Sequence, residues 1–414
     1  MQSSNRQAEF FKMALLYFTH GAAGAIWVVP LSSVLDAHGL AMIKPLAFST
    51  SALAAFVSPL IFGAIADRHM APVRVLRGLA ITTAAALALV SLGIQNAWNP
   101  WLVLALIQLY ALSASPMGSI SATIVFERLA DARKQFGPIR AMFTIGWLIG
   151  CLLVSALNAD ASPRAGYTGA ITLVLVAVST FFLPMVEMPK FNGHLSWHER
   201  LGLDALGLLK NRDHRVVFLT TTLLNIPLAA FYPHTPGQLR VLGFQHTSAW
   251  MSLGQVSEVF VMFALGTLLL RYRLKWVLLS GLGFSVARFV LCALGSKSSV
   301  LTGIFLHGFS YTLVFVTAQI YLEKRVDQAW RARAQALFSL MTGGVGNLVG
   351  YLGTGWWISA CTPSSGVPHW QVFWGGLSLA TALVTLYFLL AYRGQTGGAT
   401  ELSSNVAAAV SSAD

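Results

Sequence analysis

The sequence predicts an all-α integral membrane protein with twelve transmembrane helices. Hydrophobic residues make up 56% of the chain and charged residues 10%, against about 25% charged residues in ordinary soluble domains. The apolar residues also gather in twelve runs, most of them about as long as a helix that crosses the ~30 Å hydrocarbon core of a bilayer. A mean hydropathy of +0.66 agrees with this class.

The twelve runs fall into two groups of six. The first six are residues 13–34, 43–66, 78–94, 101–126, 142–157 and 169–185. The second six are residues 216–231, 247–270, 276–294, 300–322, 336–359 and 372–391. We therefore expect an N-terminal six-helix half (1–186), a cytoplasmic linker (187–215), a C-terminal six-helix half (216–393) and a disordered tail (394–414) rich in Gly, Ser, Thr and Ala. The short seventh run must extend into neighbouring polar residues or lie against other helices.

The linker contains a helix-start signal. Ser196-Trp-His-Glu199 matches the capping-box pattern, and Trp197, Leu201 and Leu208 then recur on one side. We predict an amphipathic helix at the cytoplasmic interface.

The basic residues set the orientation and explain the net charge of +12. With both termini in the cytoplasm, Lys44, Arg164, Arg240 and Lys297 lie outside and Arg288 lies within a span. The remaining 22 of the 27 Lys and Arg residues lie on the cytoplasmic side, as the positive-inside rule requires. We expect a multi-pass protein of a bacterial inner membrane, in contact with lipid, and no nucleic-acid partner. Arg288 is expected to hold a carbonyl or carboxylate partner.

The eighth run, Thr247–Leu270, carries a single charged residue, Glu258, near its middle. An ionised group at that depth costs several kcal/mol unless it faces protein or water. Gln255 lies three residues earlier and so on the same helical face. We interpret the two as a ligand-facing stripe; the alternative is a buried pair that joins two helices.

Other candidate motifs have simpler explanations. The cysteines Cys151, Cys292 and Cys361 lie far apart and form no CxxC, which indicates packing residues. His194 and His198 have the spacing of a helical metal pair but lack a third ligand. With no supported catalytic arrangement either, we expect no metal, no cofactor and no enzymatic activity.

Two glycine-rich stretches indicate close helix packing. Residues 343–350 superficially suggest a phosphate loop, but they follow no strand and lack Lys-Ser/Thr. Gly346 and Gly350 have the spacing of a helix-packing motif, and Gly21 and Gly24 in the first span are explained in the same way.

Residues 63–68 (GAIADR) close the second span and resemble the loop motif of the major facilitator superfamily. The match is partial, because residues 69–71 depart from the glycine and basic residue that follow in the motif. The resemblance implies two halves related by an axis along the membrane normal, a substrate site between them and access that alternates by rocking. It also implies that Asp67 and Arg68 act in gating; taken alone, they are equally explained as a loop ion pair.

Longer stretches resemble a narrower family, the bacterial nucleoside:proton symporters. The similar segments are GPIRAMFTIGW (137–147), SW with LGLDA and LKN (196–211), MSLGQVSE (251–258) and EKRV with RARAQ (323–335). The resemblance implies that the nucleoside contacts Arg140, Thr144, Trp147, Gln255 and Glu258. The spacing of the first three puts them on one helical face. Arg140 supplies donors and Trp147 a plane for stacking, although an interface anchor and a packing aromatic are the alternatives.

The chain departs from this family in the seventh span. Pro227 and Ala230 stand where the family has glutamine and asparagine, and Asn225 is the nearest amide. The contacts that recognise the base are therefore altered.

It departs again in the tenth span. His307 replaces a tyrosine, Tyr311 a phenylalanine and Thr312 an aspartate. We expect His307 and Tyr311 to line the substrate site. With the aspartate missing, Glu258 and His307 remain as candidates for proton coupling, since histidine titrates near physiological pH.

We predict a monomeric transporter that imports nucleosides by proton symport with alternating access. The alternatives are a facilitator or symporter for another small polar solute, such as a sugar or cell-wall fragment, and a membrane sensor that binds a ligand without transport.

Overall fold

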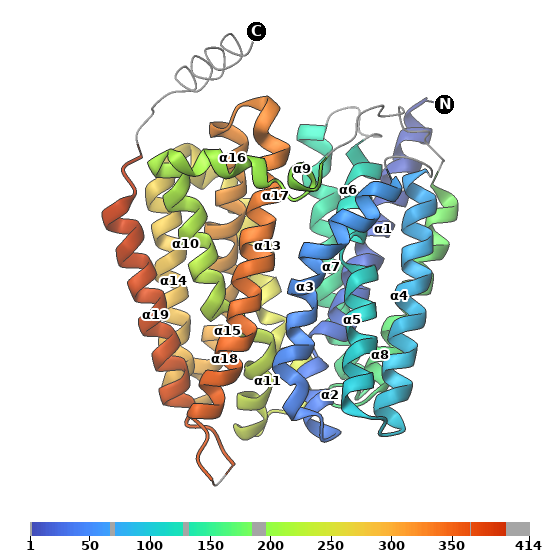
Figure 1. Ribbon diagram of the computed structural model, residues 1–414, viewed down its shortest axis with the longest axis vertical. Helices are drawn as coiled ribbons and strands as arrows, with labels where there is room; N and C mark the ends of the chain where they lie inside the picture. Colours follow the sequence, from blue (N-terminus) through green and yellow to red (C-terminus); the bar gives the residue numbers. More distant parts are fainter. Residues whose placement is uncertain (1, 67–70, 127–131, 184–195, 365, 395–414) are drawn as a thin grey trace.

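The computed structural model describes residues 2–66, 71–126, 132–183, 196–364 and 366–394, and this part of the chain contains helices and no strands (Figure 1). Twelve of its helical segments are long and apolar enough to cross a membrane. Each overlaps one of the twelve predicted runs, so the predicted class is confirmed. Helices succeed here because they satisfy their backbone hydrogen bonds internally, where lipid offers no partner.

The helices form two groups that lie side by side (Figure 1). The N-terminal half consists of α1 (Gln2–Val28), α2 (Leu31–Ala37), η1 (Ala41–Ile43), α3 (Lys44–Ala66), α4 (Pro72–Gln95), α5 (Pro100–Ala114), α6 (Met117–Phe126), α7 (Ala132–Ala156), α8 (Arg164–Ser179) and η2 (Thr180–Phe182). The C-terminal half consists of α10 (Arg212–Leu228), α11 (Phe231–Val241), α12 (Thr247–Met251), α13 (Leu253–Arg271), α14 (Leu274–Leu294), α15 (Lys297–Tyr311), η4 (Thr312–Val316), α16 (Thr317–Arg325), η5 (Gln328–Trp330), α17 (Arg331–Ser339), η6 (Leu340–Gly346), α18 (Asn347–Ala360) and α19 (Trp370–Ala391).

Each half has its own apolar core. In the N-terminal half α1 packs on α7 and α8, and α4 packs on α5 and α8. In the C-terminal half α14 packs on α15 and α19, and α13 packs on α15. The largest cluster of buried apolar side chains belongs to the first half and the next largest to the second. Two separately packed bundles can move against one another as bodies.

The seventh span is longer than its apolar run. Together α10 and α11 span Arg212–Val241, which confirms that the run extends into polar residues. Asn211 begins this span, and its side chain accepts hydrogen bonds from the backbone N–H groups of Asp213 (2.9 Å) and His214 (3.2 Å). Such a cap supplies partners that the first turn of a helix lacks.

The linker differs from the single amphipathic helix that we predicted. It contains two short elements, α9 (Trp197–Arg200) and the 3₁₀ segment η3 (Leu203–Lys210). Gly202 separates them with φ +67°, and a Cβ there would lie 2.5 Å from the carbonyl oxygen of Arg333 on α17. The close approach to α17 needs a residue without a side chain in a left-handed conformation, which breaks the helix. Leu208 is buried against the C-terminal half, while Trp197 is exposed.

Glycines set the closest helix crossings, as the sequence predicted. A Cβ at Gly21 on α1 would overlap the carbonyl oxygen of Phe143 on α7, and a Cβ at Gly146 on α7 would overlap that of Phe18 on α1. The backbones of α1 and α7 therefore touch.

The second glycine stretch packs in the same way. A Cβ at Gly346 would lie 2.9 Å from the Thr222 carbonyl oxygen, and a Cβ at Gly350 would lie 2.6 Å from Cβ of Ala229. Both neighbours belong to the seventh span, Thr222 to α10 itself, which confirms helix packing as the explanation of this stretch.

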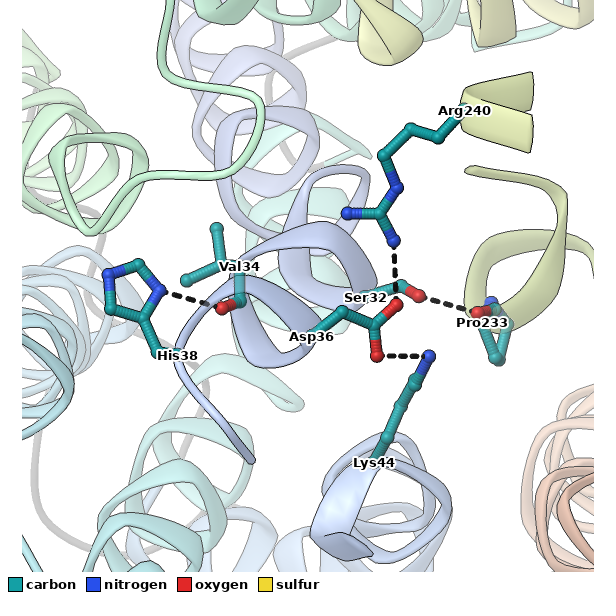
Figure 2. A network of polar contacts seen from close by, with 7 residues as sticks. All are labelled: Ser32, Val34, Asp36, His38, Lys44, Pro233 and Arg240. Atoms are coloured by element: carbon teal, nitrogen blue, oxygen red, sulfur yellow. Dashed lines mark hydrogen bonds and ion pairs between the residues drawn. The ribbon is translucent and has the colours of Figure 1, made fainter. Parts of the chain in front are cut away.

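The two halves meet on the face opposite the two termini (Figure 1). There the Asp36 carboxylate at the end of α2 lies 2.6 Å from Nζ of Lys44 in its own half and 2.7 Å from Nη2 of Arg240 on α11 in the other half (Figure 2). Ser32 also donates to the carbonyl oxygen of Pro233 on α11. We call the contact of Asp36 with Arg240 the inter-half ion pair.

A second polar contact joins the halves on this face. Asp160, in the loop after α7, accepts a hydrogen bond of 2.6 Å from the backbone N–H of Ser248 at the start of α12. Ser155 accepts one of 3.0 Å from the N–H of Ala249. Residues of the N-terminal half thus cap a helix of the C-terminal half.

The crossing of α1 and α7 gives a stability prediction. Gly146→Ala should lower the stability of the protein by about 1 to 3 kcal/mol, because the new methyl group overlaps a backbone carbonyl that cannot rotate away. Gly78→Ala is the matched control: Gly78 lies on α4, and nothing lies within 4 Å of the position that a Cβ would take there. The midpoint of thermal unfolding in detergent measures both; equal midpoints for the two variants would contradict the contact.

Candidate functional site

A cavity of about 430 Å³ lies between the two halves. Its volume is within the range of small-molecule sites. Its walls combine aromatic rings with polar and charged side chains: Arg140, Phe143, Thr144, Trp147, Asn225, Leu228, Ala229, Phe231, Tyr232, Gln255, Glu258, His307, Tyr311, Phe315, Gln319, Phe338, Ser339, Thr342, Gly343, Asn347 and Tyr351. All seven residues that we predicted to contact substrate are among them.

The N-terminal half contributes one face of α7. Arg140, Thr144 and Trp147 line the cavity together, as their spacing predicted. Two of their buried donors, Nη1 of Arg140 and Nε1 of Trp147, have no hydrogen-bond partner among the described residues. A buried donor without a partner is costly, so a ligand that accepts hydrogen bonds would be favoured at this wall.

The C-terminal half contributes the stripe on α13. Gln255 and Glu258 are 5% and 8% exposed, and both line the cavity. Within the described part of the chain neither side chain makes a hydrogen bond or ion pair. A pair that only joins two helices would bond to a neighbouring helix, so the structure favours the ligand-facing interpretation. Glu258 and Arg140 place opposite charges on opposite halves.

The tenth span contributes His307 and Tyr311 at the end of α15, followed by η4, a π-helical segment whose Phe315 also lines the cavity. Single π-helical turns are frequent at functional sites because they redirect side chains. Thr312, where the family has aspartate, is fully buried and does not line the cavity.

Arg288 lies behind the cavity wall. Its Nη1 is 2.6 Å from Nδ1 of His307. The expected carbonyl or carboxylate partner is therefore replaced by an imidazole, since helix packing brings α14 and α15 together at this level.

In the seventh span Asn225 lines the cavity, whereas Pro227 and Ala230 do not. The Asn225 amide donates to the carbonyl oxygen of Thr342 and to Oδ1 of Asn347, each at 2.7 Å. Thr342 belongs to η6, a second π-helical segment. Asn225, the amide nearest to the altered positions 227 and 230, thus forms part of the cavity wall.

Several wall residues were not predicted from the sequence. Gln319 and Asn347 are amides within apolar spans, and the argument applied to Gln255 would have found them. Asn347 lies inside the glycine stretch that we interpreted only as packing. The sequence did not mark Tyr232 and Tyr351 as wall residues, because aromatic residues are common in membrane spans.

The aromatic side chains offer planes to a flat ligand. The ring centroids of Trp147 and Tyr232, from opposite halves, lie 6.1 Å apart. Tyr311 and Phe315 stack at 5.3 Å. Any nucleobase can stack on such planes, because every base has a π-face.

The predicted gating residues Asp67 and Arg68 lie outside the described residues, as does His194. Among the residues that are described, no group of three or more His, Cys, Asp or Glu side chains could hold a metal ion.

A family model described as Nucleoside H+ symporter matches residues 6–397. The chain belongs to the nucleoside H+ symporter family. It is 32% identical over 401 residues to the putative nucleoside transporter YegT of Escherichia coli (strain K12), a match that covers 92% of this chain and 93% of that protein. It is 26% identical over 346 residues to the nucleoside permease NupG of the same organism, covering 79% and 82% of the two chains.

The fold agrees with this family. The crystal structure of the nucleoside transporter NupG matches with a TM-score of 0.81 at 23% sequence identity, covering 93% of this chain and 99% of that one. The predicted fold of two six-helix halves, the major facilitator fold, is thereby confirmed. Members of the family carry nucleosides together with protons, and this chain is a multi-pass membrane transporter of that family.

Arg140→Ala and Gln255→Ala should each weaken nucleoside binding by about 1 to 3 kcal/mol, because each leaves a polar group of the bound ligand without a partner. The exposed residues Arg164 and Gln371 provide matched controls, and their alanine variants should bind as the wild type does. Calorimetry on purified protein measures the affinities. Wild-type affinity in either cavity variant would remove that residue from the site.

Proposed function

We propose that the protein imports nucleosides with protons, and that the cavity between the halves is the nucleoside site. The observation that supports this proposal most is the pair of unpartnered donors on α7, which face the carboxylate and amide of α13 across one cavity. A nucleoside presents acceptors on its base and hydroxyl groups on its ribose. Such a site can match both ends of one molecule.

The donors, acceptors and aromatic planes of the cavity suit different parts of a nucleoside. The Arg140 guanidinium has only donors and suits carbonyl or ring-nitrogen acceptors. Glu258 keeps acceptor oxygens in either protonation state and suits the ribose hydroxyl groups, while the Gln255 amide can serve either. Trp147 and Tyr311 offer planes on which the base can stack. Because Arg140 and Glu258 belong to different halves, bound substrate would hold the halves together.

Glu258 is the group to which we assign the proton. It is 8% exposed, lies near the middle of its span, and has no partner among the described residues. An uncompensated carboxylate at that depth costs several kcal/mol. Protonation removes this cost in the loaded step, in which the proton and the nucleoside cross together, and Arg140 across the cavity compensates the ionised carboxylate in the empty return step.

Alternating access follows from the placement of the contacts between halves. Here the halves are joined on the face opposite the termini, and the cavity extends toward α16 and α17 on the terminal face through Gln319, Phe338 and Ser339. We propose that both termini are cytoplasmic, that the protein works as a monomer in a bacterial inner membrane, and that this conformation opens inward. Opening outward then requires the inter-half ion pair to break.

Uptake of labelled nucleosides into vesicles with an imposed pH gradient tests the proposal. We expect saturable uptake that rises with an inward proton gradient and is competed by nucleosides, not by sugars or peptides. Competition by a sugar or a cell-wall fragment alone would identify another solute. Saturable binding without uptake under any gradient would identify a sensor.

Glu258→Gln should abolish accumulation of nucleoside against its gradient and preserve exchange of nucleoside across the membrane, because the neutral amide resembles the protonated acid. Glu323→Gln is the matched control, since Glu323 pairs with Arg331 at an exposed position and its loss should leave accumulation unchanged. Uphill uptake driven by pH in Glu258→Gln would exclude the proton role.

The inter-half ion pair gives a prediction about conformation. Arg240→Ala should favour outward opening by about two- to fivefold, because an ion pair with partly exposed partners contributes up to about 1 kcal/mol. A cysteine introduced at Gly343 in the cavity reports this as a faster reaction with an impermeant thiol reagent added from outside. Lys44→Ala breaks only the pair within the N-terminal half and should react as the wild type does. Equal effects of the two substitutions would show that the pair between halves has no special role.

A further inference from the structure

Arg288 is a buried cation that the proposed transport cycle does not use. It lies on α14, is 1% exposed, and forms no ion pair with a carboxylate in the described part of the chain. Its Nε has no hydrogen-bond partner there. A guanidinium in a span is costly to bury, so its position calls for an explanation.

Arg288 packs against two phenylalanine rings and makes a polar contact with the imidazole of His307. Its guanidinium carbon lies 4.8 Å from the ring centroid of Phe231 and 5.0 Å from that of Phe289. Its Nη1 lies 2.6 Å from Nδ1 of His307, which lines the cavity. Arg288 does not itself line the cavity; it touches two residues that do, Phe231 through its ring face and His307 through a hydrogen bond.

The direction of this hydrogen bond fixes the state of the imidazole. A guanidinium has N–H donors and no acceptor, so Nδ1 of His307 must accept. The Nδ1 atom then carries no proton, and the neutral ring carries its proton on Nε2. Protonating Nδ1 would set two donors and two positive charges against each other at 2.6 Å.

The orientation of the ring is fixed as well. The His307 ring stacks on Phe231 with centroids 4.2 Å apart and an interplanar angle of 14°. On another side it packs on Gly254 of α13, where a Cβ would lie 3.2 Å from Cδ2 of the ring. The contact with Arg288 is the only hydrogen bond of the imidazole within the described residues, which leaves Nε2–H for the cavity.

We propose that Arg288 is a positioning residue that holds His307 as a neutral imidazole, so that His307 donates from Nε2 to an acceptor atom of the bound nucleoside. In this arrangement His307 does not carry the transported proton. This inference rests on the proposed function in one respect, because the acceptor atom belongs to a bound nucleoside. The protonation state of the imidazole does not depend on any substrate.

Several titratable groups surround His307, and its pH response must be separated from theirs. They are Arg288 on α14, Arg140 on α7, Glu258 on α13, Tyr232 on α11 and Tyr311 on α15; Cys292 lies beside Arg288 rather than beside the imidazole. Glu258 shares the cavity and is assigned the proton, so a pH dependence of binding in the wild type is expected to come from Glu258. Substitution of His307 should therefore leave the midpoint of that dependence unchanged.

The first experiment requires no substrate. In protein labelled with ¹⁵N-histidine, the signals of His307 are identified as those missing from His307→Gln. We expect a neutral ring with its proton on Nε2 from about pH 5.5 to about pH 8. Arg288→Met should release the ring to exchange tautomers and to protonate in this range, and Arg271→Met, at an exposed position of α13, is the matched control. A wild-type His307 that protonates in this range would overturn the assignment.

The second experiment tests whether Arg288 acts through His307. Arg288→Met and His307→Phe should each weaken nucleoside binding about tenfold near neutral pH. The double variant should bind no worse than the weaker single variant, because both remove one interaction. Arg288→Met alone should add a protonation step to the pH profile of binding, and His307→Phe should abolish that step. Additive losses would overturn the positioning role.

The two experiments separate the possible failures. If the wild type binds no nucleoside, the proposed function fails, while the tautomer of His307 still tests the role of Arg288. If Arg288→Met does not fold, Arg288→Lys retains a charged donor and should preserve the Nε2–H tautomer. Loss of that tautomer in folded Arg288→Lys, with nucleoside binding unchanged, would show that binding does not depend on the orientation of His307.

Discussion

Water is scarce in the interior of a bilayer, so each polar group in a span needs a protein partner or a cavity. This constraint organises the whole molecule. Serine and threonine side chains throughout the spans bond to carbonyl oxygens of their own helices, as Thr83 and Thr354 do. Three polar groups that do not, Glu258, Gln255 and Nη1 of Arg140, lie around one cavity between the halves. The cavity is thus a place where several polar groups of the spans are left without a protein partner.

The contacts that build each half are more extensive than those that join the halves. Within the N-terminal half, α1 and α7 meet backbone to backbone at Gly21 and Gly146, and any separation would open a void in lipid or core. Between the halves, by contrast, the inter-half ion pair has partly exposed partners. Such pairs are weak and exchange readily with water. A small apolar cluster, which includes Ala25 and Leu239, also joins the halves. Rocking of two rigid bodies therefore requires this cluster as well as the polar contacts to separate.

The C-terminal half supplies most of the residues that line the cavity. Its spans carry two π-helical segments, η4 and η6, and both line the cavity. Three departures from the family resemblance, at His307, Tyr311 and Thr312, fall next to or within η4. Replacement of a tyrosine by His307 exchanges one donor for another whose proton position depends on Arg288. The fold is thus kept while the recognition groups change, which is how related transporters can differ in substrate.

The sequence by itself determined the twelve spans, because the thickness of the bilayer sets their length and each helix satisfies its own backbone. It also determined which side chains of α7 share a helical face and which of α13 do, because helical periodicity depends only on local spacing. Tertiary structure alone decided that Arg240 meets Asp36, far away along the chain, that Gly202 breaks the linker helix, and that Arg288 bonds an imidazole. These features depend on which helices pack together and at what level, and neither apolar length nor periodicity within a single helix encodes the partner of a side chain on another helix.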